Sequence, residues 1–170
     1  MNRAVVIRTS RGLADHVLAT EPEATTRGVV VGFDARADSE RFARDAVATL
    51  AAGGLPVRWF PTPQPTPLVA YAQKALDAAA AVVVTASHNP PQDNGYKVYG
   101  EAAAQIAPPV DAAIAAAIDR VGPAAEVPRV DPVTSDLVAP VPGEVVDRYF
   151  AELANALPAV EGPELTIAYT

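Results

Sequence analysis

Hydrophobic residues in the first half of the chain form short continuous runs, and amphipathic stretches separate these runs. The runs cover residues 28–33, 55–60 and 80–85. The first and the third are rich in valine, which is typical of strands that are buried on both faces of a sheet. We therefore predict a strand at each of the three positions.

A well-defined amphipathic pattern lies between the first two runs. Phe42, Ala46 and Leu50 recur at every fourth position, and charged residues occupy the opposite face. This period is that of an α-helix with one apolar side. Two glycines, at positions 53 and 54, are suitable residues to end it.

Two more helices are predicted from weaker signals. Thr66 is a candidate N-cap and Pro67 suits the first turn of a helix that leads into the third run. The stretch up to about Thr20 indicates a leading helix, although Gly12 lowers its helix propensity. Because strands alternate with helices, we predict an α/β fold, a three-layer α/β/α sandwich with a mixed, mostly parallel sheet.

After the third run, the pattern predicts a pair of short strands and then a helix. Residues 96–99 and 104–107 are candidate antiparallel strands. The helix would carry Val110, Ile114, Ile118 and Val121 on one face, and the Gly-Pro pair at 122–123 would end it.

The remaining residues indicate a connector and the start of a second unit. Residues 122–142 contain five prolines and are predicted to connect two units. A further amphipathic helix is expected from about Glu144 to Leu157, and residues 164–169 resemble a buried strand. We therefore expect one domain over residues 1–142, and a linker helix with the first strand of an incomplete second domain over residues 143–170.

Composition and charge narrow the possible functions. Half of the 170 residues are apolar, which is enough to build a core. The net charge of 13 − 20 = −7 argues against a nucleic-acid partner, because such proteins usually carry a basic face. The absence of cysteine excludes disulfides, zinc thiolates and cysteine nucleophiles. The longest apolar run, residues 78–84, is far below the roughly 18 residues that a membrane helix needs, so we expect no membrane partner and a cytoplasmic protein.

The candidate chemistry lies in residues 85–100, TASHNPPQDNGYKVYG, directly after a buried strand. Ligands of α/β sheets collect at the carboxyl ends of strands, although an ordinary solvated turn would have a similar composition. A serine hydrolase is disfavoured because GxSxG is absent and adjacent side chains seldom face each other. In phosphoryl transfer, Ser87 could carry the phosphate, Asn89 could donate to it, and Lys97 could supply charge or move a proton.

These residues resemble the α-D-phosphohexomutase superfamily. TASHNP matches the phosphoserine loop T-[AG]-S-H-N-P of that family, and NGYK places Lys97 ten residues after Ser87. VVVGFDAR, residues 29–36, resembles the family's strand and GxDxR element, and PTPQPTP, residues 61–67, resembles its PTP turn. The forms FDAR, DNGYKVY and AQI are most similar to the branch that contains phosphoglucomutase-2-like and phosphopentomutase enzymes and bacterial phosphomannomutases.

The resemblance implies a phosphosugar mutase of carbohydrate metabolism. Such an enzyme moves phosphate between the 1 and 6 (or 5) positions of a sugar monophosphate through a phosphoserine and a bisphosphorylated sugar, which also serves as activator. Ser87 would be the phosphoryl carrier, Lys97 the proton-transfer helper and His88 an active-site contact. Magnesium would bind the phosphate on Ser87 together with aspartates of a DGDxDR loop.

Other residues of the motifs are expected to support the loop. Asn89 flanks the serine, and Asp34 and Arg36 either form an ion pair that supports the loop or contact phosphate; we favour the ion pair. His16 is expected to be structural, and Asp93 to serve a turn.

Several family motifs are absent from this sequence. It contains no DGDxDR loop and no N-terminal GT[AS]G[LI]R, and Arg11 does not match the arginine of the latter. We therefore expect a fragment that is inactive alone and whose partners include the remaining domains of the same enzyme. The alternatives are a non-catalytic remnant that binds phosphate or a partner, and a domain that assembles with separately made domains through the apolar face of the last helix. The sequence does not indicate which sugar is used.

Overall fold

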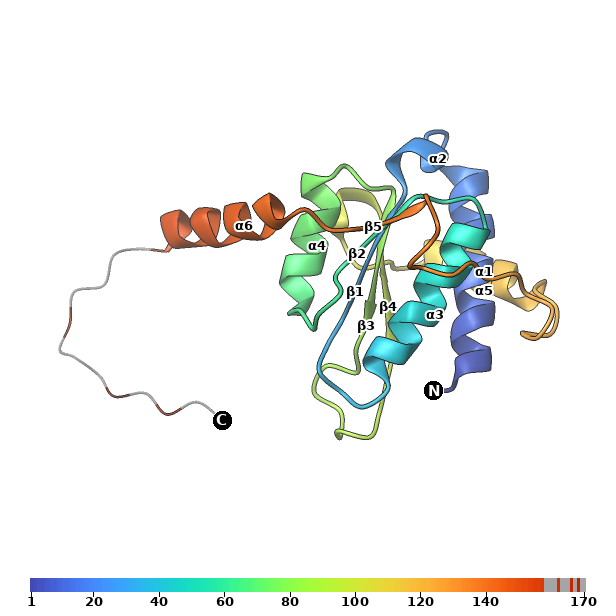
Figure 1. Ribbon diagram of the computed structural model, residues 1–170, viewed down its shortest axis with the longest axis horizontal. Helices are drawn as coiled ribbons and strands as arrows, with labels where there is room; N and C mark the ends of the chain where they lie inside the picture. Colours follow the sequence, from blue (N-terminus) through green and yellow to red (C-terminus); the bar gives the residue numbers. More distant parts are fainter. Residues whose placement is uncertain (158–161, 163–165, 167, 169–170) are drawn as a thin grey trace.

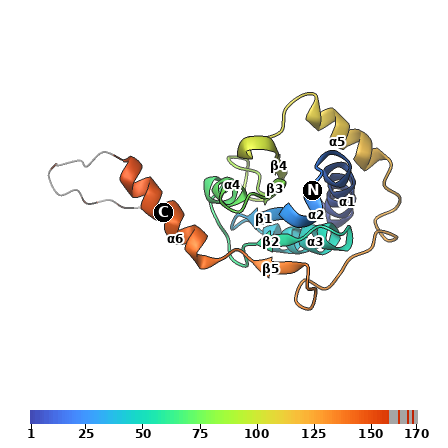
Figure 2. The ribbon, with the colours of Figure 1, turned by 90° about the horizontal axis from the view of Figure 1, so that it is seen from above.

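The computed structural model describes residues 1–157, 162, 166 and 168, and these contain one five-stranded sheet. The strand order is β4-β3-β1-β2-β5, and every neighbouring pair is parallel except β3 with β4. Helices cover both faces of this sheet (Figures 1 and 2). The predicted fold class is therefore confirmed: the chain is an α/β protein with a mixed, mostly parallel sheet.

The described elements alternate between strand and helix through the first half of the chain. The strands are β1 (Val29–Phe33), β2 (Val57–Trp59), β3 (Ala80–Val84), β4 (Tyr96–Tyr99) and β5 (Val138–Pro140). The helices are α1 (Arg3–Thr20), α2 (Ala24–Arg27), α3 (Ser39–Ala52), α4 (Thr66–Ala75), α5 (Val110–Asp119) and α6 (Gly143–Ala156), and a 3-10 turn covers Glu101–Ala103. None of the helices in this part of the chain is long and apolar enough to cross a membrane.

The central strands are buried on both faces, as their valine-rich sequences predict. All five residues of β1 and all five of β3 are buried. Along β1, Val29, Val31 and Phe33 belong to the core beneath α1 and α3, whereas Val30 belongs to the core beneath α4. Burial of each such side chain contributes about 1.5–3 kcal/mol to the stability of the folded state. The two strands therefore stabilise the apolar cores on both faces of the sheet.

Helices α1 and α3 lie on one face of the sheet, and α4 lies on the other (Figure 2). Helix α5 packs against the outer side of α1, where Gly12 permits a close approach. A Cβ atom at Gly12 would lie 2.6 Å from the Cα atom of Ile118 in α5. The glycine that weakened the helix prediction therefore has a packing function.

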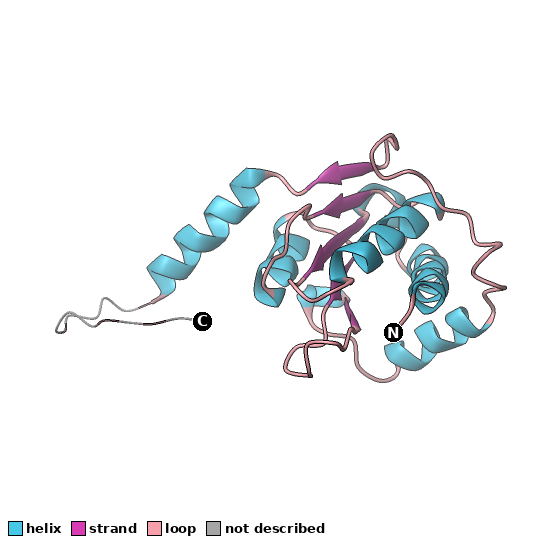
Figure 3. Cartoon of the chain, turned by 60° about the horizontal axis from the view of Figure 1, so that its bottom comes forward, coloured by secondary structure: helices cyan, strands magenta, loops and turns pink. Residues whose placement is uncertain are grey.

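Helix α6 projects from the body of the molecule (Figures 1 and 3). Its first half contacts α4: Val145 is buried, and the rings of Tyr149 and Tyr71 meet edge to face at 5.2 Å. Further along, Phe150, Leu153 and Leu157 are exposed. One part of the amphipathic face is thus covered by α4, and the rest faces solvent in this chain.

The structure corrects several sequence-based predictions. The segment predicted as a connector contains β5, which adds a fifth strand beside β2. Residues 104–107 do not form a strand, because Gln105 makes only an isolated bridge to Tyr99. Thr66 is the first helical residue and Pro65 occupies the N-cap position, without a side-chain cap. The helix predicted to extend to Val121 ends at Asp119. The strand predicted for residues 164–169 lies outside the fully described segments.

Candidate functional site

The candidate site lies at the carboxyl ends of two neighbouring strands, β1 and β3. Residues 85–95, here called the Ser87 loop, connect β3 to β4, and residues 34–38 connect β1 to α3. Both connections lie at the lower end of the sheet in Figure 1, the first in yellow-green and the second in blue. Because β1 and β3 are parallel and adjacent, the motifs that follow them meet although they are about 50 positions apart in sequence.

A network around the Asp34 carboxylate joins the two connections. Its Oδ2 accepts a 2.6 Å hydrogen bond from the Thr85 hydroxyl, and its Oδ1 accepts one of 2.7 Å from the Ser39 hydroxyl. The amide of Asn94 donates to the Ser39 oxygen at 2.9 Å. Burial alone would raise the pKa of Asp34, but the hydrogen bonds from Thr85, Ser39 and Arg36 outweigh it and hold that pKa below its usual value. Asp34 is therefore a fixed anion beneath the loop.

Arg36 ties the Ser87 loop to this network. Its Nε donates to Asp34 Oδ2 at 2.9 Å, which is the expected ion pair, and its side chain is only 13% exposed. Its Nη atoms donate to four loop carbonyl oxygens, those of Ser87, Asn89, Pro90 and Asp93, at 2.6, 3.0, 2.7 and 3.3 Å. A guanidinium has five N–H donors, so these five acceptors use its whole capacity. Arg36 thus contacts the loop backbone from within and has no donor left for a ligand.

Ser87 is exposed at the start of the loop. The backbone N–H of Ser87 donates to the Thr85 hydroxyl at 3.0 Å, and its φ is +54°, in the region that favours glycine. A non-glycine residue there costs of order 1–3 kcal/mol and persists only where its surroundings enforce it. Here Thr85 and Arg36 hold the two sides of the residue and leave its hydroxyl side chain open to solvent.

The other predicted site residues lie near the same end of the sheet. Lys97 is half-buried on β4 and pairs with Val83, one position before the end of β3. His88 and Asn89 follow Ser87 in the exposed part of the loop. Gly95 lets the two ends of the loop approach, since a Cβ atom there would lie 2.6 Å from the Thr85 carbonyl oxygen. The sheet therefore brings the sequence motifs to one edge, with the loop between them.

A shallow hollow of about 440 Å³ adjoins the loop and is lined by Asp34, Ala35, Arg36, Ala37, Asn89 and Pro91.

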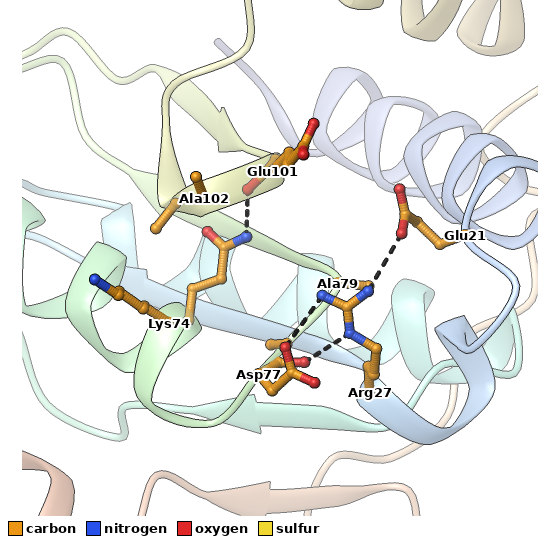
Figure 4. Close-up of a pocket in the computed structure, with 11 residues that line it drawn as sticks. Glu21, Arg27, Lys74, Asp77, Ala79, Glu101 and Ala102 are labelled. Carbon is orange, nitrogen blue, oxygen red and sulfur yellow. Dashed lines mark hydrogen bonds and ion pairs between the residues drawn. The ribbon is translucent and has the colours of Figure 1, made fainter.

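A second cavity, of about 460 Å³, lies at the opposite end of the sheet, beside Ala79 and the turn after β4 (Figure 4). There Arg27 donates to Glu21 and to Asp77, so its charge is neutralised within the protein. None of the predicted site residues lines that cavity.

Side chains of the types that commonly hold metal ions are not clustered in the described part of the chain. No group of three His, Asp or Glu side chains gathers anywhere in this part of the chain. Asp34, the carboxylate within the network, already uses both oxygens as hydrogen-bond acceptors.

The sequence alone indicates no role for three members of the network, Thr85, Ser39 and Asn94. Thr85 and Asn94 stand in the quoted motifs, and Ser39 follows the GxDxR element by three residues. Short polar side chains at strand ends and helix starts commonly bind the local backbone. The residue types alone therefore did not indicate that these side chains would meet around one carboxylate. Their contacts depend on the adjacency of β1 and β3.

Comparisons with known proteins agree with this arrangement. Residues 1–124 match the family described as phosphoglucomutase/phosphomannomutase, alpha/beta/alpha domain I. A probable phosphomannomutase of Haemophilus influenzae is 42% identical over 160 residues, 91% of this chain and 31% of that protein. A phosphopentomutase of Homo sapiens is 41% identical over 125 residues, 70% of this chain and 20% of that protein.

A solved structure, that of a Thermus thermophilus protein assigned as a phosphomannomutase, superposes with a TM-score of 0.77 at 30% identity. It covers 93% of this chain, and the match spans 33% of that protein. The chain thus spans between a fifth and a third of the length of these relatives. The matched sequence and the shared fold together show that this chain belongs to the phosphoglucomutase/phosphomannomutase family, also called the phosphohexomutase superfamily, through its first α/β/α domain.

Proposed function

We propose that this chain is the phosphoserine-bearing domain of a phosphosugar mutase and that Ser87 carries the phosphoryl group. The observation that supports this most directly is the presentation of Ser87. Its hydroxyl side chain is exposed at the carboxyl end of a buried parallel strand, and its backbone is fixed by Thr85 and Arg36. A fixed, exposed hydroxyl at this edge of an α/β sheet suits a group that is alternately phosphorylated and dephosphorylated.

The proposed reaction is a pair of phosphoryl transfers. In the first, the bond between phosphorus and Ser87 Oγ breaks, and a bond forms from phosphorus to a free hydroxyl oxygen of a sugar monophosphate. The proton of that hydroxyl passes to a base, and the serine oxygen is left to be protonated. In the second, the other phosphate of the resulting sugar bisphosphate returns to Ser87. The substrates are hexose or pentose phosphates, in keeping with the names of the relatives.

Lys97 is proposed as the proton-transfer residue, and His88 and Asn89 as contacts to the phosphate or the sugar. Lys97 is half-buried on β4, near the end of β3 from which Ser87 extends. A lysine there can offset the negative charge of the phosphate and exchange a proton. Magnesium, which would bind an oxygen of the phosphoserine, and a sugar bisphosphate activator belong to the same proposal.

The exposed end of α6 is proposed as the surface that receives the rest of the enzyme. Phe150, Leu153 and Leu157 form an apolar strip beyond the contact with α4. The relatives are three to five times longer than the segment that this chain matches, which supports polypeptide of the same enzyme as the occupant. We propose that the complete enzyme acts in the cytoplasm.

A chimera tests the proposed function. This chain would replace the corresponding segment of the Haemophilus influenzae relative, with which it shares 42% identity over 160 residues. We expect conversion of mannose 1-phosphate to mannose 6-phosphate, loss of turnover in Ser87→Ala and full turnover in Ser135→Ala, a serine of the segment before β5. Turnover that survives Ser87→Ala would contradict the proposal. A folded chimera that binds inorganic phosphate but never turns over would favour a non-catalytic phosphate-binding domain.

A further inference from the structure

Ser87 and His88 are the central residues of a tight turn. The N–H of Asn89 donates to the carbonyl oxygen of Ala86 at 3.0 Å, which closes the turn. Of the two central residues, only Ser87 has a positive φ, at +54°. A positive φ at the first central position alone identifies a type II′ turn. The turn type fixes the direction of the peptide group between Ser87 and His88.

In a type II′ turn, ψ of the first central residue is about −120°. This ψ value places the N–H of His88 on the same side as the Cβ atom of Ser87. The carbonyl group of Ser87 then points to the opposite side. The Ser87–His88 peptide is trans, so its C=O and N–H point in opposite directions. Arg36 Nη2 holds that carbonyl oxygen at 2.6 Å from inside the loop. The N–H of His88 therefore points outward, beside the Ser87 side chain.

This N–H is the available backbone donor next to the Ser87 hydroxyl. The N–H of Ser87 itself is occupied by the Thr85 hydroxyl at 3.0 Å. In the described part of the chain, the His88 N–H makes no backbone hydrogen bond. Arg36 also binds the carbonyl oxygens of Asn89 and Pro90. The residues that follow these two carbonyls are Pro90 and Pro91, which have no N–H, so these two peptide groups offer no further backbone donor.

We propose that the backbone N–H of His88 binds the phosphoryl group on Ser87, and that Arg36 is the positioning residue that turns this N–H toward it. The inference rests on the proposed function, in which Ser87 is phosphorylated. A backbone N–H that donates to a phosphate oxygen makes a charge-assisted hydrogen bond, stronger than a neutral one. Arg36 acts through the peptide group alone, because its five N–H donors are used by Asp34 and by the loop.

The first experiment uses the 170-residue chain with phosphoserine incorporated at position 87 during translation. Amide spectra of ¹⁵N-labelled protein with serine and with phosphoserine are compared at about pH 8, where phosphoserine is a dianion. We expect a marked downfield shift of the His88 amide proton and slower exchange of that proton with solvent. An unchanged His88 amide, or a downfield shift confined to other amides, would overturn the inference.

The second experiment separates positioning from charge. Lysine keeps the charge of arginine but lacks its planar fork, so Arg36→Lys cannot hold the four carbonyls together. We expect Arg36→Lys to abolish the downfield shift of the His88 amide. The matched control is Arg41→Lys on α3, whose side chain pairs with Asp38 and which should keep the full shift. Retention of the shift in Arg36→Lys would refute the positioning role.

The two proposals can fail separately in these experiments. Because phosphoserine is installed by translation, the amide shift does not depend on mutase activity. Unchanged dispersion of the core valine amides in Arg36→Lys checks that this variant is folded. If the variant does not fold, the comparison of serine with phosphoserine in the wild-type sequence still tests the inference. Absence of turnover in the folded, unsubstituted chimera would count against the proposed function alone. An unresponsive His88 amide would count against this inference alone.

Discussion

At the level of single residues, Asp34 and Arg36 form a half-buried support with little spare hydrogen-bonding capacity. Both oxygens of the Asp34 carboxylate accept hydrogen bonds, and all donors of the Arg36 guanidinium are used. Removal of one member of such a network costs more than a typical hydrogen bond, because its partners stay buried and unpaired. The conformation of Ser87 therefore depends on residues that need not touch a ligand.

The substitution Asp34→Asn tests this support. The amide would present an N–H₂ group where the carboxylate accepts from Thr85 or Ser39, and it would remove the ion pair with Arg36. We expect the free energy of unfolding in urea to fall by about 1.5–3 kcal/mol. Asp93→Asn is the matched control in the same loop and should change it little. Equal effects of the two substitutions would show that the network contributes nothing.

The lowered pKa of Asp34 predicts a dependence of stability on pH. A carboxyl group whose pKa is lower in the folded state stabilises the fold at pH values above its unfolded pKa of about 3.9, and this contribution is lost as the pH falls through the folded-state pKa. The difference in unfolding free energy between wild type and Asp34→Asn should therefore be constant from about pH 7 to 5 and shrink below about pH 4. A difference that grows on acidification would contradict this assignment.

The sequence indicated the site residues through type and motif, but not through their contacts. Ser87, Lys97, Asp34 and Arg36 stand in motifs that resemble the family, and the Asp34–Arg36 ion pair was expected. The sequence could not predict that the hydroxyls of Thr85 and Ser39 both donate to the Asp34 carboxylate, because this requires β1 and β3 to be neighbours. Strand adjacency depends on packing across the whole sheet, which no local pattern encodes.

At the level of elements, close helix packing explains the glycine within α1. A Cβ atom at Gly12 would lie 2.6 Å from the backbone of Ile118, so α1 and α5 meet without a side chain between them. We expect Gly12→Ala to lower the unfolding free energy by about 1–3 kcal/mol, although alanine is the better helix former.

The control for this prediction is Gly143→Ala at the start of α6. An added Cβ atom there meets nothing within 4 Å, so the change should be neutral or slightly stabilising. Both variants would be measured by thermal unfolding under the same conditions. If Gly12→Ala proved as stable as Gly143→Ala, the close approach of α1 and α5 would be wrong.

Long periodic elements were predictable, and of the two edge strands β4 was predicted at residues 96–99 whereas β5 was not. The valine-rich runs gave β1 and β3, and the 3.6-residue period gave α3 and α6. Strand β5 was missed because three residues among prolines carry no period. It exists through its pairing with β2, and Pro140 is tolerated because β5 is an edge strand.

At the level of the whole molecule, the 170-residue chain contributes between a fifth and a third of the length of its relatives. Its described residues contain no cluster of metal-binding side chains, and the hollow beside the Ser87 loop is open. We expect the isolated chain, given glucose 1-phosphate, glucose 1,6-bisphosphate and magnesium, to form glucose 6-phosphate no faster than its Ser87→Ala variant. Clearly faster turnover in a coupled assay would show that this domain is sufficient for catalysis.

If Ser87 carries a phosphoryl group, the phosphate should be present in the protein when it is purified from the cells that make it. The chain has serines at 10, 39, 87 and 135, and the first and second are fully buried. Peptide mapping by mass spectrometry should find phosphate on Ser87 in a substantial fraction of molecules and on none of the other three. Complete absence of phosphate from Ser87 in the folded Haemophilus influenzae chimera, also after its exposure to a sugar bisphosphate and magnesium, would contradict this role of Ser87.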